Sequence, residues 1–213
     1  EAHHISKVLR FSEGGELLVT NGNGSVFRTT IAQIRKRSVQ LTVKEHHFIE
    51  KPSFSGISLH VGLLKNKDRM EWLVEKATEI GVGSINWLHT DRSERGKVRL
   101  DRMEAIAVSA MKQSLQNWLP RIAVSTLDES LKKIPSNSSI YIAHELASSE
   151  GKQAPISTEK TSVDLFIGPE GEFTSDEVQK VVNLGGKSLL LGQNRLRTET
   201  AAVTLLLYYH LHG

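Results

Sequence analysis

Short apolar runs alternate with segments of helical periodicity from residue 49 to the end of the chain. Buried strands that are separated by amphipathic helices are joined by crossover connections, and such strands pair in parallel. The alternation therefore predicts an α/β domain over residues 49–213, with a parallel sheet covered by helices. The expected strands lie at residues 57–64, 84–89, 140–144, 163–167 and 188–191.

The first two helices of this domain have recognisable ends. One carries Asp68 and Glu71 in the pattern of a capping box, repeats apolar residues at helical spacing, and stops at Gly81. The next starts at Asp101 and must end before Pro120, because proline cannot continue a helix.

Two further helices are expected near the C-terminus. One opens near Thr174, where Glu177 completes a capping box, and the glycine pair at 185–186 ends it. The last helix, over residues 200–211, is apolar on most sides, so we expect it to be packed deeply.

The first 48 residues follow a different pattern. Between residues 16 and 45, apolar residues tend to alternate with polar ones, and the turn sequence at 21–24 (Asn-Gly-Asn-Gly) interrupts them. This pattern predicts three short antiparallel strands, then a linker at residues 46–55, with a domain boundary after residue 48. The segment also carries seven basic and four acidic residues, so nearly all of the formal net charge of +3 lies in it.

Composition narrows the class of protein. The apolar content of 38% is compatible with a globular fold, and the absence of cysteine excludes disulfide scaffolds, iron–sulfur clusters, thiolate zinc sites and cysteine nucleophiles. The longest apolar runs are far shorter than the ~20 residues of a membrane helix, and no signal segment opens the chain, so we expect a soluble cytoplasmic protein. Because the chain starts with Glu1 rather than Met, we expect further N-terminal residues to precede it.

Two of the predicted strands run directly into unusual loops. The strand at 163–167 leads into residues 168–173 (GPEGEF), and the strand at 188–191 leads into residues 192–195. Ligands bind beyond the carboxyl ends of strands in open α/β sheets, so both loops are predicted to face one site. Their glycines let a ligand approach the main chain closely, and Pro169 stiffens the first turn. Two ordinary strand-to-helix turns are the alternative.

Common catalytic and phosphate-binding motifs are absent. The chain has neither the P-loop pattern nor G-x-G-x-x-G, so a ligand without phosphates is favoured. The pairs at 3–4 and 46–47, both His-His, lack the spacing of helical ligands, and no H-E-x-x-H occurs, so no metal site is expected. Ser114 lies outside any G-x-S-x-G elbow, which argues against a serine hydrolase.

Two charged segments are candidates to face an anion. Arg195 and Arg197 precede an apolar helix, where cations are unfavourable beside the helix dipole, so an RNA phosphate or a charged transition state suits them better. Thr198 and Glu199 could instead cap that helix. Residues 92–102 hold five basic residues against two acidic ones, which suits either a solvated loop or a nucleic-acid surface.

Four motifs occur in order along the chain: residues 71–82 (EWLVEKATEIGV), residues 112–114 (KQS) with Pro120, residues 167–173 (IGPEGEF) and residues 191–201 (LGQNRLRTETA). Together with residues 4–10 (HISKVLR), they resemble the ribosomal RNA small subunit methyltransferase E family over nearly the whole chain. Two positions depart from the family pattern. Glu172 stands where glycine is frequent, which puts an extra carboxylate near the expected cofactor site, and Lys112 stands where glutamate is usual.

This resemblance implies a fold and an activity. Members of the family are S-adenosylmethionine (SAM)-dependent enzymes that methylate N3 of one uridine in 16S ribosomal RNA of the small subunit, and they act as homodimers. The implied fold is a PUA-like β-barrel that binds RNA (residues 1–48), followed by a SPOUT-type α/β domain (residues 49–213) with a deep trefoil knot from about residue 140 onward. The last helix and the helix over residues 70–80 would form the dimer surface.

The residues and the resemblance together assign candidate roles. Cofactor contacts are expected at His144, Gly168, Pro169, Glu170, Gly171, Leu191, Gly192 and Leu196. Arg197 would stabilise the negative charge that spreads over the uridine oxygens when N3 loses its proton, and Glu199 or Glu170 would handle that proton or orient the base. RNA contacts are expected at Arg10, Arg28, Arg35, Arg92, Arg95 and Arg195.

Two other functions stay open at this point. A non-catalytic RNA-binding assembly factor would use the basic N-terminal strands and would not bind SAM. A SPOUT methyltransferase acting on a ribose 2′-hydroxyl or on a transfer RNA would bind SAM but yield a different methylated nucleoside.

Overall fold

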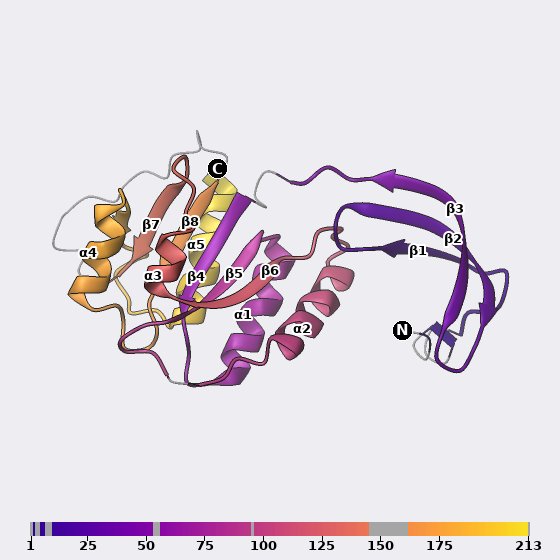
Figure 1. The fold of residues 1–213 in the computed structure, drawn as a ribbon, viewed down its shortest axis with the longest axis horizontal. Coiled ribbons are helices and arrows are strands. Elements are labelled where there is room, and N and C mark those ends of the chain that lie inside the picture. Colours follow the sequence, from indigo (N-terminus) through magenta and orange to yellow (C-terminus); the bar gives the residue numbers. More distant parts are fainter. Residues whose placement is uncertain are drawn as a thin grey trace. The chain divides into compact units, whose positions relative to one another are not determined.

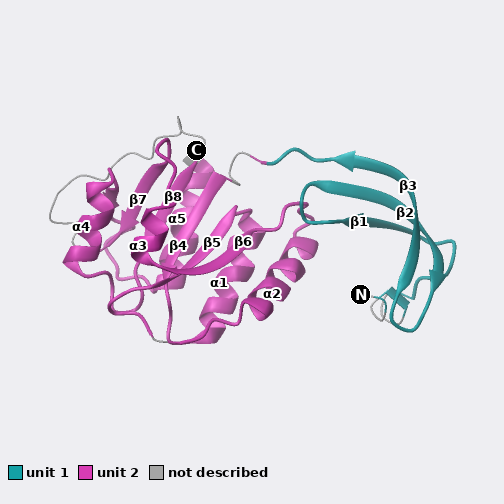
Figure 2. Ribbon diagram, viewed as in Figure 1, with its two compact units in different colours: residues 1–51 teal, residues 52–213 magenta. Residues whose placement is uncertain are grey.

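The computed structural model describes residues 2, 5–6, 10–52, 56–94, 96–144 and 162–212. The chain divides into two compact units, residues 1–51 and 52–213 (Figure 2). The division falls three residues beyond the boundary inferred from the sequence. The reason is that strand β3 (Val39–Phe48) extends through residues 46–48, which were expected to belong to a linker.

Unit 1 contains an antiparallel sheet in the order β1-β2-β3, with β1 (Glu16–Thr20) and β2 (Ser25–Ile34) joined by the predicted turn. In that turn Asn21 Oδ1 accepts hydrogen bonds from the backbone N–H groups of Asn23 (2.8 Å) and Ser25 (3.3 Å). The three predicted strands are therefore confirmed. Closure of this sheet into the expected β-barrel stays a prediction.

Unit 2 is built on a parallel sheet in the order β6-β5-β4-β8-β7-β9, which confirms the predicted sheet type (Figure 1). Its strands are β4 (Ile57–Gly62), β5 (Ser84–His89), β6 (Arg121–Thr126), β7 (Ser139–Ala143), β8 (Val163–Ile167) and β9 (Lys187–Leu189). The sequence analysis missed β6. This edge strand is mostly half-buried, so its residues lack the long apolar run of the central strands.

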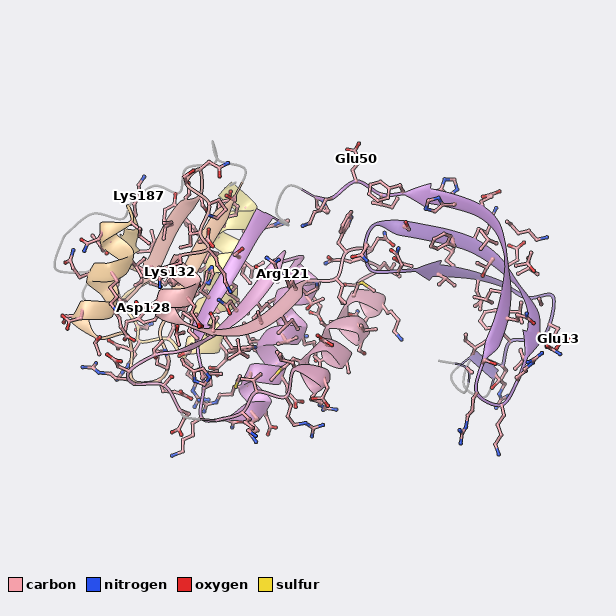
Figure 3. The ribbon with its side chains drawn as sticks, viewed as in Figure 1. Glu13, Glu50, Arg121, Asp128, Lys132 and Lys187 are labelled. Atoms are coloured by element: carbon pink, nitrogen blue, oxygen red, sulfur yellow. The ribbon has the colours of Figure 1, made fainter. Side chains whose placement is uncertain are left out.

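Helices cover both faces of this sheet (Figure 1). The helices are α1 (Lys67–Ile80), α2 (Leu100–Gln113), α3 (Leu127–Leu131), α4 (Ser175–Asn183) and α5 (Thr198–His212). Side chains of α1, α2 and α5 pack on one face, and those of α3 and α4 pack on the other. Figure 3 labels two exposed residues here, Asp128 on α3 and Lys132 directly after it. Helix α3 is too short to be predicted from periodicity.

The helix ends follow local capping chemistry. Asn66, rather than Asp68, caps α1: its Oδ1 accepts the backbone N–H of Asp68 at 2.8 Å. The predicted capping box at Asp68 is therefore wrong, whereas the box formed by Thr174 and Glu177 at α4 is confirmed. Helix α5 begins at Thr198, two residues before the predicted start.

The core on the α1, α2 and α5 face is dense and apolar. Leu59, Trp87 and Leu165 from the central strands are fully buried there, and they pack with Leu73 of α1 and Leu205 of α5. Burial of each such side chain contributes roughly 1.5–3 kcal/mol. The predicted deep packing of the last helix is therefore correct for this face of α5.

The opposite face holds a buried polar network. His60 Nε2 lies 2.7 Å from Asp164 Oδ1, and His60 Nδ1 lies 2.7 Å from Ser130 Oγ. Ser138 Oγ donates to the second carboxylate oxygen of Asp164. Because Ser130 is only 2% exposed, a substrate cannot reach this hydrogen-bonded Ser–His–Asp chain. Its role is structural: it connects α3 and the residue before β7 to the sheet.

The strand order places the C-terminal loops together. Strand β8 lies between β4 and β7, and β9 lies beyond β7, so three adjacent strands end at the same edge of the sheet. Helix α5 follows β9 and packs against α1. Within the described ranges, no helix is both long enough and apolar enough to span a bilayer.

Candidate active site

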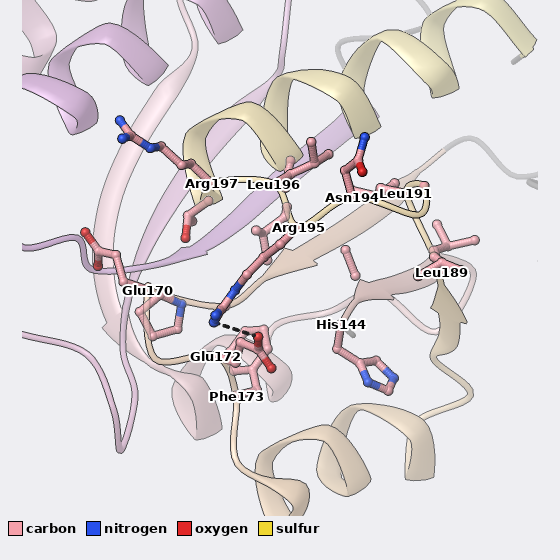
Figure 4. A pocket seen from close by; sticks show the side chains of 18 of the residues that line it. His144, Glu170, Glu172, Phe173, Leu189, Leu191, Asn194, Arg195, Leu196 and Arg197 are labelled. Atoms are coloured by element: carbon pink, nitrogen blue, oxygen red, sulfur yellow. Dashed lines mark hydrogen bonds and ion pairs between the residues drawn. The ribbon is translucent and has the colours of Figure 1, made fainter. Parts of the chain in front are cut away.

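A pocket of about 940 Å³ lies at the carboxyl ends of β7, β8 and β9, next to the start of α5 (Figure 4). Residues from both predicted loops line it, together with Ala143 at the end of β7, His144 directly after it, and Arg69 from α1. The structure thus brings the two loops to one site. This is the arrangement expected where parallel strands end side by side.

The loop after β8 is tightly wound. The backbone N–H of Glu172 donates to Pro169 O at 2.9 Å, and Glu172 adopts φ 61°. A Cβ at Gly168 would lie 2.9 Å from the backbone N of Phe173. Glycine is therefore required at position 168 for the loop to close on itself.

Gly62, at the end of β4, allows this loop to approach the sheet. A Cβ at position 62 would lie 2.4 Å from Pro169 Cδ and 2.5 Å from Pro169 N. Both are closer than real Cβ contacts allow, and both belong to a rigid ring or its backbone. The pocket wall at Pro169 thus depends on a glycine in a different strand.

The loop after β9 forms the facing wall. Gly192 adopts φ 142°, a conformation that favours glycine. Leu191 and Leu196 are partly buried and pack against the core of the α5 face. The guanidinium of Arg195 reaches across the pocket, where Nη2 lies 3.3 Å from Glu172 Oε1 (Figure 4).

Charged residues surround the start of α5. Arg197 is exposed at the pocket, and its backbone carbonyl accepts the N–H of Ala201 at 2.8 Å. Glu199 is 8% exposed and does not line the pocket; its Oε1 is 3.6 Å from Nε of Arg69, which does. A carboxylate in the first turn also stabilises the positive end of the helix dipole.

Glu170 and Arg92 connect the loop after β8 to neighbouring segments. The carboxylate of Glu170 accepts the backbone N–H of Lys65, with N–O distances of 3.2 and 3.4 Å. Arg92 Nη1 donates to Gly171 O at 3.2 Å. The Arg92 side chain thus supports the loop from outside, in addition to any role in RNA binding.

Most of the predicted cofactor residues line the pocket. His144, Gly168, Pro169, Glu170, Leu191, Gly192 and Leu196 do so, whereas Gly171 faces Arg92 instead. Of the predicted catalytic residues, Arg197 and Glu170 line the pocket and Glu199 does not. His144 Nε2 also lies 2.9 Å from Ser188 Oγ, which links the ends of β7 and β9.

The predicted RNA-binding residues fall into two groups. Arg195 lines the pocket and Arg92 lies beside it, while Arg10, Arg28 and Arg35 are exposed on unit 1. Arg28 lies 3.9 Å from Glu16 and 3.7 Å from Glu45, so its charge is shared with two carboxylates. Arg95 lies outside the described residues.

The sequence analysis missed Arg69 and the role of Gly62. A glycine at the end of a buried strand is a known sign of close backbone approach, and this sign was available at Gly62. Arg69 carried no such sign, because its partner Glu199 is 130 residues away in the sequence. Among the described residues, no group of three or more His, Asp or Glu side chains is placed to hold a metal ion.

Comparison with known proteins identifies the family. Residues 50–210 match the RNA methyltransferase domain, and residues 1–44 match the RNA methyltransferase PUA domain. The ribosomal RNA small subunit methyltransferase E of Rickettsia conorii is 31% identical over 216 residues, covering 99% of this chain and 86% of the relative. The chain belongs to this methyltransferase E family. The resemblance stated from the four motifs is confirmed.

Two solved structures of this methyltransferase group superimpose on nearly the full chain. A probable rRNA-methyltransferase from Porphyromonas gingivalis matches with a TM-score of 0.91 and 33% identity, covering 98% of this chain and 89% of that one. The methyltransferase E from Neisseria gonorrhoeae, solved bound to S-adenosyl methionine, matches with a TM-score of 0.84 and 27% identity, covering 99% and 88%. The predicted α/β fold with a PUA domain is confirmed.

Proposed function

We propose that this chain is a SAM-dependent methyltransferase of the small ribosomal subunit, and that it methylates N3 of a uridine in 16S ribosomal RNA. The observation that carries the proposal is the pocket at the ends of β7, β8 and β9. Membership of the methyltransferase E family supports the reaction type. The SAM-bound relative from N. gonorrhoeae supports the cofactor.

The pocket suits SAM in size and in lining. Its volume of about 940 Å³ lies near the upper end of the ~300–1,000 Å³ typical of small-molecule sites. Leu189, Leu191 and Leu196 provide apolar walls for a planar base, and a glycine main chain at 168 and 192 offers backbone hydrogen-bonding groups without side chains in front of them. Two carboxylates, at Glu170 and Glu172, suit a cationic ligand.

The chemistry requires removal of a weakly acidic proton from uridine N3. When bound, SAM supplies an electrophilic methyl group on a sulfonium. Glu170 is placed to accept the proton or to orient the base: its carboxylate is held by the N–H of Lys65 and retains further acceptor positions. Arg197, exposed at the pocket, stabilises negative charge on the uridine oxygens.

Glu199 acts through Arg69 in this proposal. Glu199 is buried and ion-paired, so it holds Arg69 at the pocket wall and stabilises the start of α5. Arg195, with a side chain that is 71% exposed, binds an RNA phosphate. The exposed arginines of unit 1 add a sequence-independent attraction to RNA, since that unit matches a PUA domain.

The finer features of the fold belong to the same proposal. The chain forms the trefoil knot of SPOUT enzymes in its C-terminal part, which would explain why β8 and β9 lie on opposite sides of β7. It acts as a cytoplasmic homodimer through α1 and α5. Large apolar side chains support this dimer surface because they stay exposed on these two helices: Trp72, Leu207, Tyr208 and Leu211.

Two measurements test the function. Isothermal titration calorimetry with SAM should show binding at one site per chain, and no binding would leave a non-catalytic RNA-binding factor as the better account. Incubation with SAM and small subunits that lack the modification should yield 3-methyluridine in 16S RNA by mass spectrometry. A ribose-methylated nucleoside, or a product found only in transfer RNA, would reject the proposed position.

The Arg197→Ala variant tests the charge-stabilising role. Removing one donor to a developing anion lowers turnover by ~100-fold or more, while the affinity for SAM should change little. Arg121→Ala is a matched control, because Arg121 is an exposed arginine at the amino end of edge strand β6 (Figure 3). Equal turnover of the two variants would remove Arg197 from the mechanism.

A further inference from the structure

Glu172 has an unusual backbone for its residue type. Its φ of 61° lies in the left-handed region, which residues other than glycine rarely occupy. The loop holds it there through the hydrogen bond from Glu172 N to Pro169 O at 2.9 Å. Residues kept in such conformations cluster at ligand sites, and Glu172 lines the pocket.

The carboxylate of Glu172 is directed across the pocket. It lies 3.3 Å from the guanidinium of Arg195, and the two side chains are 34% and 71% exposed (Figure 4). The contact joins the loop after β8 to the loop after β9. Because Arg195 is the more exposed partner, the guanidinium can move into solvent or onto RNA while Glu172 stays at the pocket.

The other charged side chains at the pocket make Glu172 important for the sign of the electrostatic potential there. Among the residues that the structure describes, the charged side chains that line the pocket are three cations and two carboxylates: Arg69, Arg195, Arg197, Glu170 and Glu172. Glu199 offsets Arg69 from behind, and the carboxylate of Glu170 is directed to the N–H of Lys65. Without Glu172, arginines would outnumber carboxylates among these described side chains and would disfavour a cationic ligand.

We propose that Glu172 is a specificity-determining residue that makes the pocket prefer cationic SAM over neutral S-adenosylhomocysteine (SAH). The inference rests on the proposed function. In that reaction the methyl group moves from sulfur to N3 of uridine, the N3 proton passes to a base or to solvent, and the sulfonium becomes a neutral thioether. The ligand therefore loses one positive charge per turnover, and a carboxylate at the pocket favours release of the product and entry of the next donor.

Calorimetric titration of the full chain with SAM, SAH and sinefungin tests the proposal without measuring activity. Sinefungin carries a protonated amine in place of the methylated sulfonium, so it separates charge from contact with the methyl group. The Glu172→Gln variant should lower the ratio of SAM to SAH affinity by about 5-fold, the effect of one partly screened charge. Affinity for sinefungin should fall in parallel with affinity for SAM.

Three further variants test the direction of the charge effect and provide a control. Arg195→Ala removes the cation that offsets Glu172, so the ratio of SAM to SAH affinity should rise. Glu172→Gly removes the charge and also relieves the left-handed backbone, so it should fold and should lower the ratio as the glutamine variant does. Glu104→Gln, at an exposed site on α2, is the matched control and should leave the ratio unchanged.

The outcomes separate this inference from the proposed function. If the wild-type chain binds neither SAM nor SAH, the proposed function fails. If the wild type binds both, and the variants at Glu172 keep the wild-type ratio, the methyltransferase assignment stands and the role of Glu172 is wrong. A loss of SAM affinity with no parallel loss for sinefungin would also overturn the charge-based explanation.

Discussion

Replacing Gly62 by alanine should damage the pocket from a distance. The added Cβ would lie 2.4 Å from Pro169 Cδ and 2.5 Å from Pro169 N, whereas ordinary contacts begin near 3.4 Å. Either β4 or the loop after β8 must therefore shift by about 1 Å. Strand β4 is central in the sheet and bonded on both sides, so the loop is expected to move.

The size of the effect follows from the rigidity of the neighbour. Overpacking a well-ordered site costs typically 1–3 kcal/mol, and a proline ring with its own backbone N can adjust little, so we expect about 2–3 kcal/mol. For a chain of this length, this corresponds to a fall in Tm of roughly 5–10 °C. A displacement of about 1 Å among groups that position a substrate can reduce turnover by ~100-fold.

Thermal unfolding and calorimetry with SAM measure the two consequences separately. Gly96→Ala is the matched control, because a Cβ at position 96 has nothing within 4 Å. If Gly62→Ala has the same Tm and the same SAM affinity as Gly96→Ala, Pro169 does not depend on Gly62. Reduced stability with unchanged SAM binding would instead show that the strand moves and the pocket loop does not.

Two further predictions concern stability. Asp164→Ala should destabilise unit 2 by ~3–5 kcal/mol, as measured by chemical denaturation, because it leaves buried His60 without its carboxylate. The control Asp176→Ala removes an exposed carboxylate of α4 and should cost less than ~1 kcal/mol. Equal losses for the two variants would contradict the structural role of the network. The pKa of Glu71 lies below its ordinary value, chiefly because Arg102 donates to both carboxylate oxygens at 3.1 and 2.9 Å. Since the folded-state pKa is lowered, the ion pair stabilises the fold at pH values above the ordinary pKa of glutamate. This stabilisation is lost as the pH falls through the lowered pKa. The Tm difference between wild type and Glu71→Gln should therefore be present at neutral pH and vanish in acid, and a difference that persists in acid would refute the linkage.

The central strands and the long helices were predictable from the sequence because their signals are local. Strand β8 is apolar at every position except Asp164 and is buried throughout, and α4 carries its start signal at Thr174. Strand β6 and helix α3 escaped prediction, since one lies half-buried at a sheet edge and the other is five residues long. Their formation depends on tertiary contacts that a local pattern does not contain.

The strand order could not be read from local patterns either. That β8 lies between β4 and β7 depends on pairings between residues more than a hundred positions apart, such as Leu59 with Leu165. The His60–Asp164 pair could not be predicted either, because nothing in the sequence around either residue indicates that the two side chains meet. General rules predicted the edge of the sheet where ligands bind, but only the fold brings the particular side chains together.

The arginines before α5 show how residues that are unfavourable for the local structure can indicate a functional site. Cations are unfavourable beside a helix N-terminus, so capping does not explain Arg195 or Arg197. In the structure the capping region is stabilised by Glu199 in the first turn, while Arg195 reaches Glu172 and Arg197 stays exposed at the pocket. The unfavourable dipole interaction is thus tolerated at a position where both arginines line the pocket. If these arginines served only the fold, replacing both by glutamine would stabilise α5 without weakening RNA binding; we expect the substitution to weaken RNA binding and reduce its dependence on salt concentration.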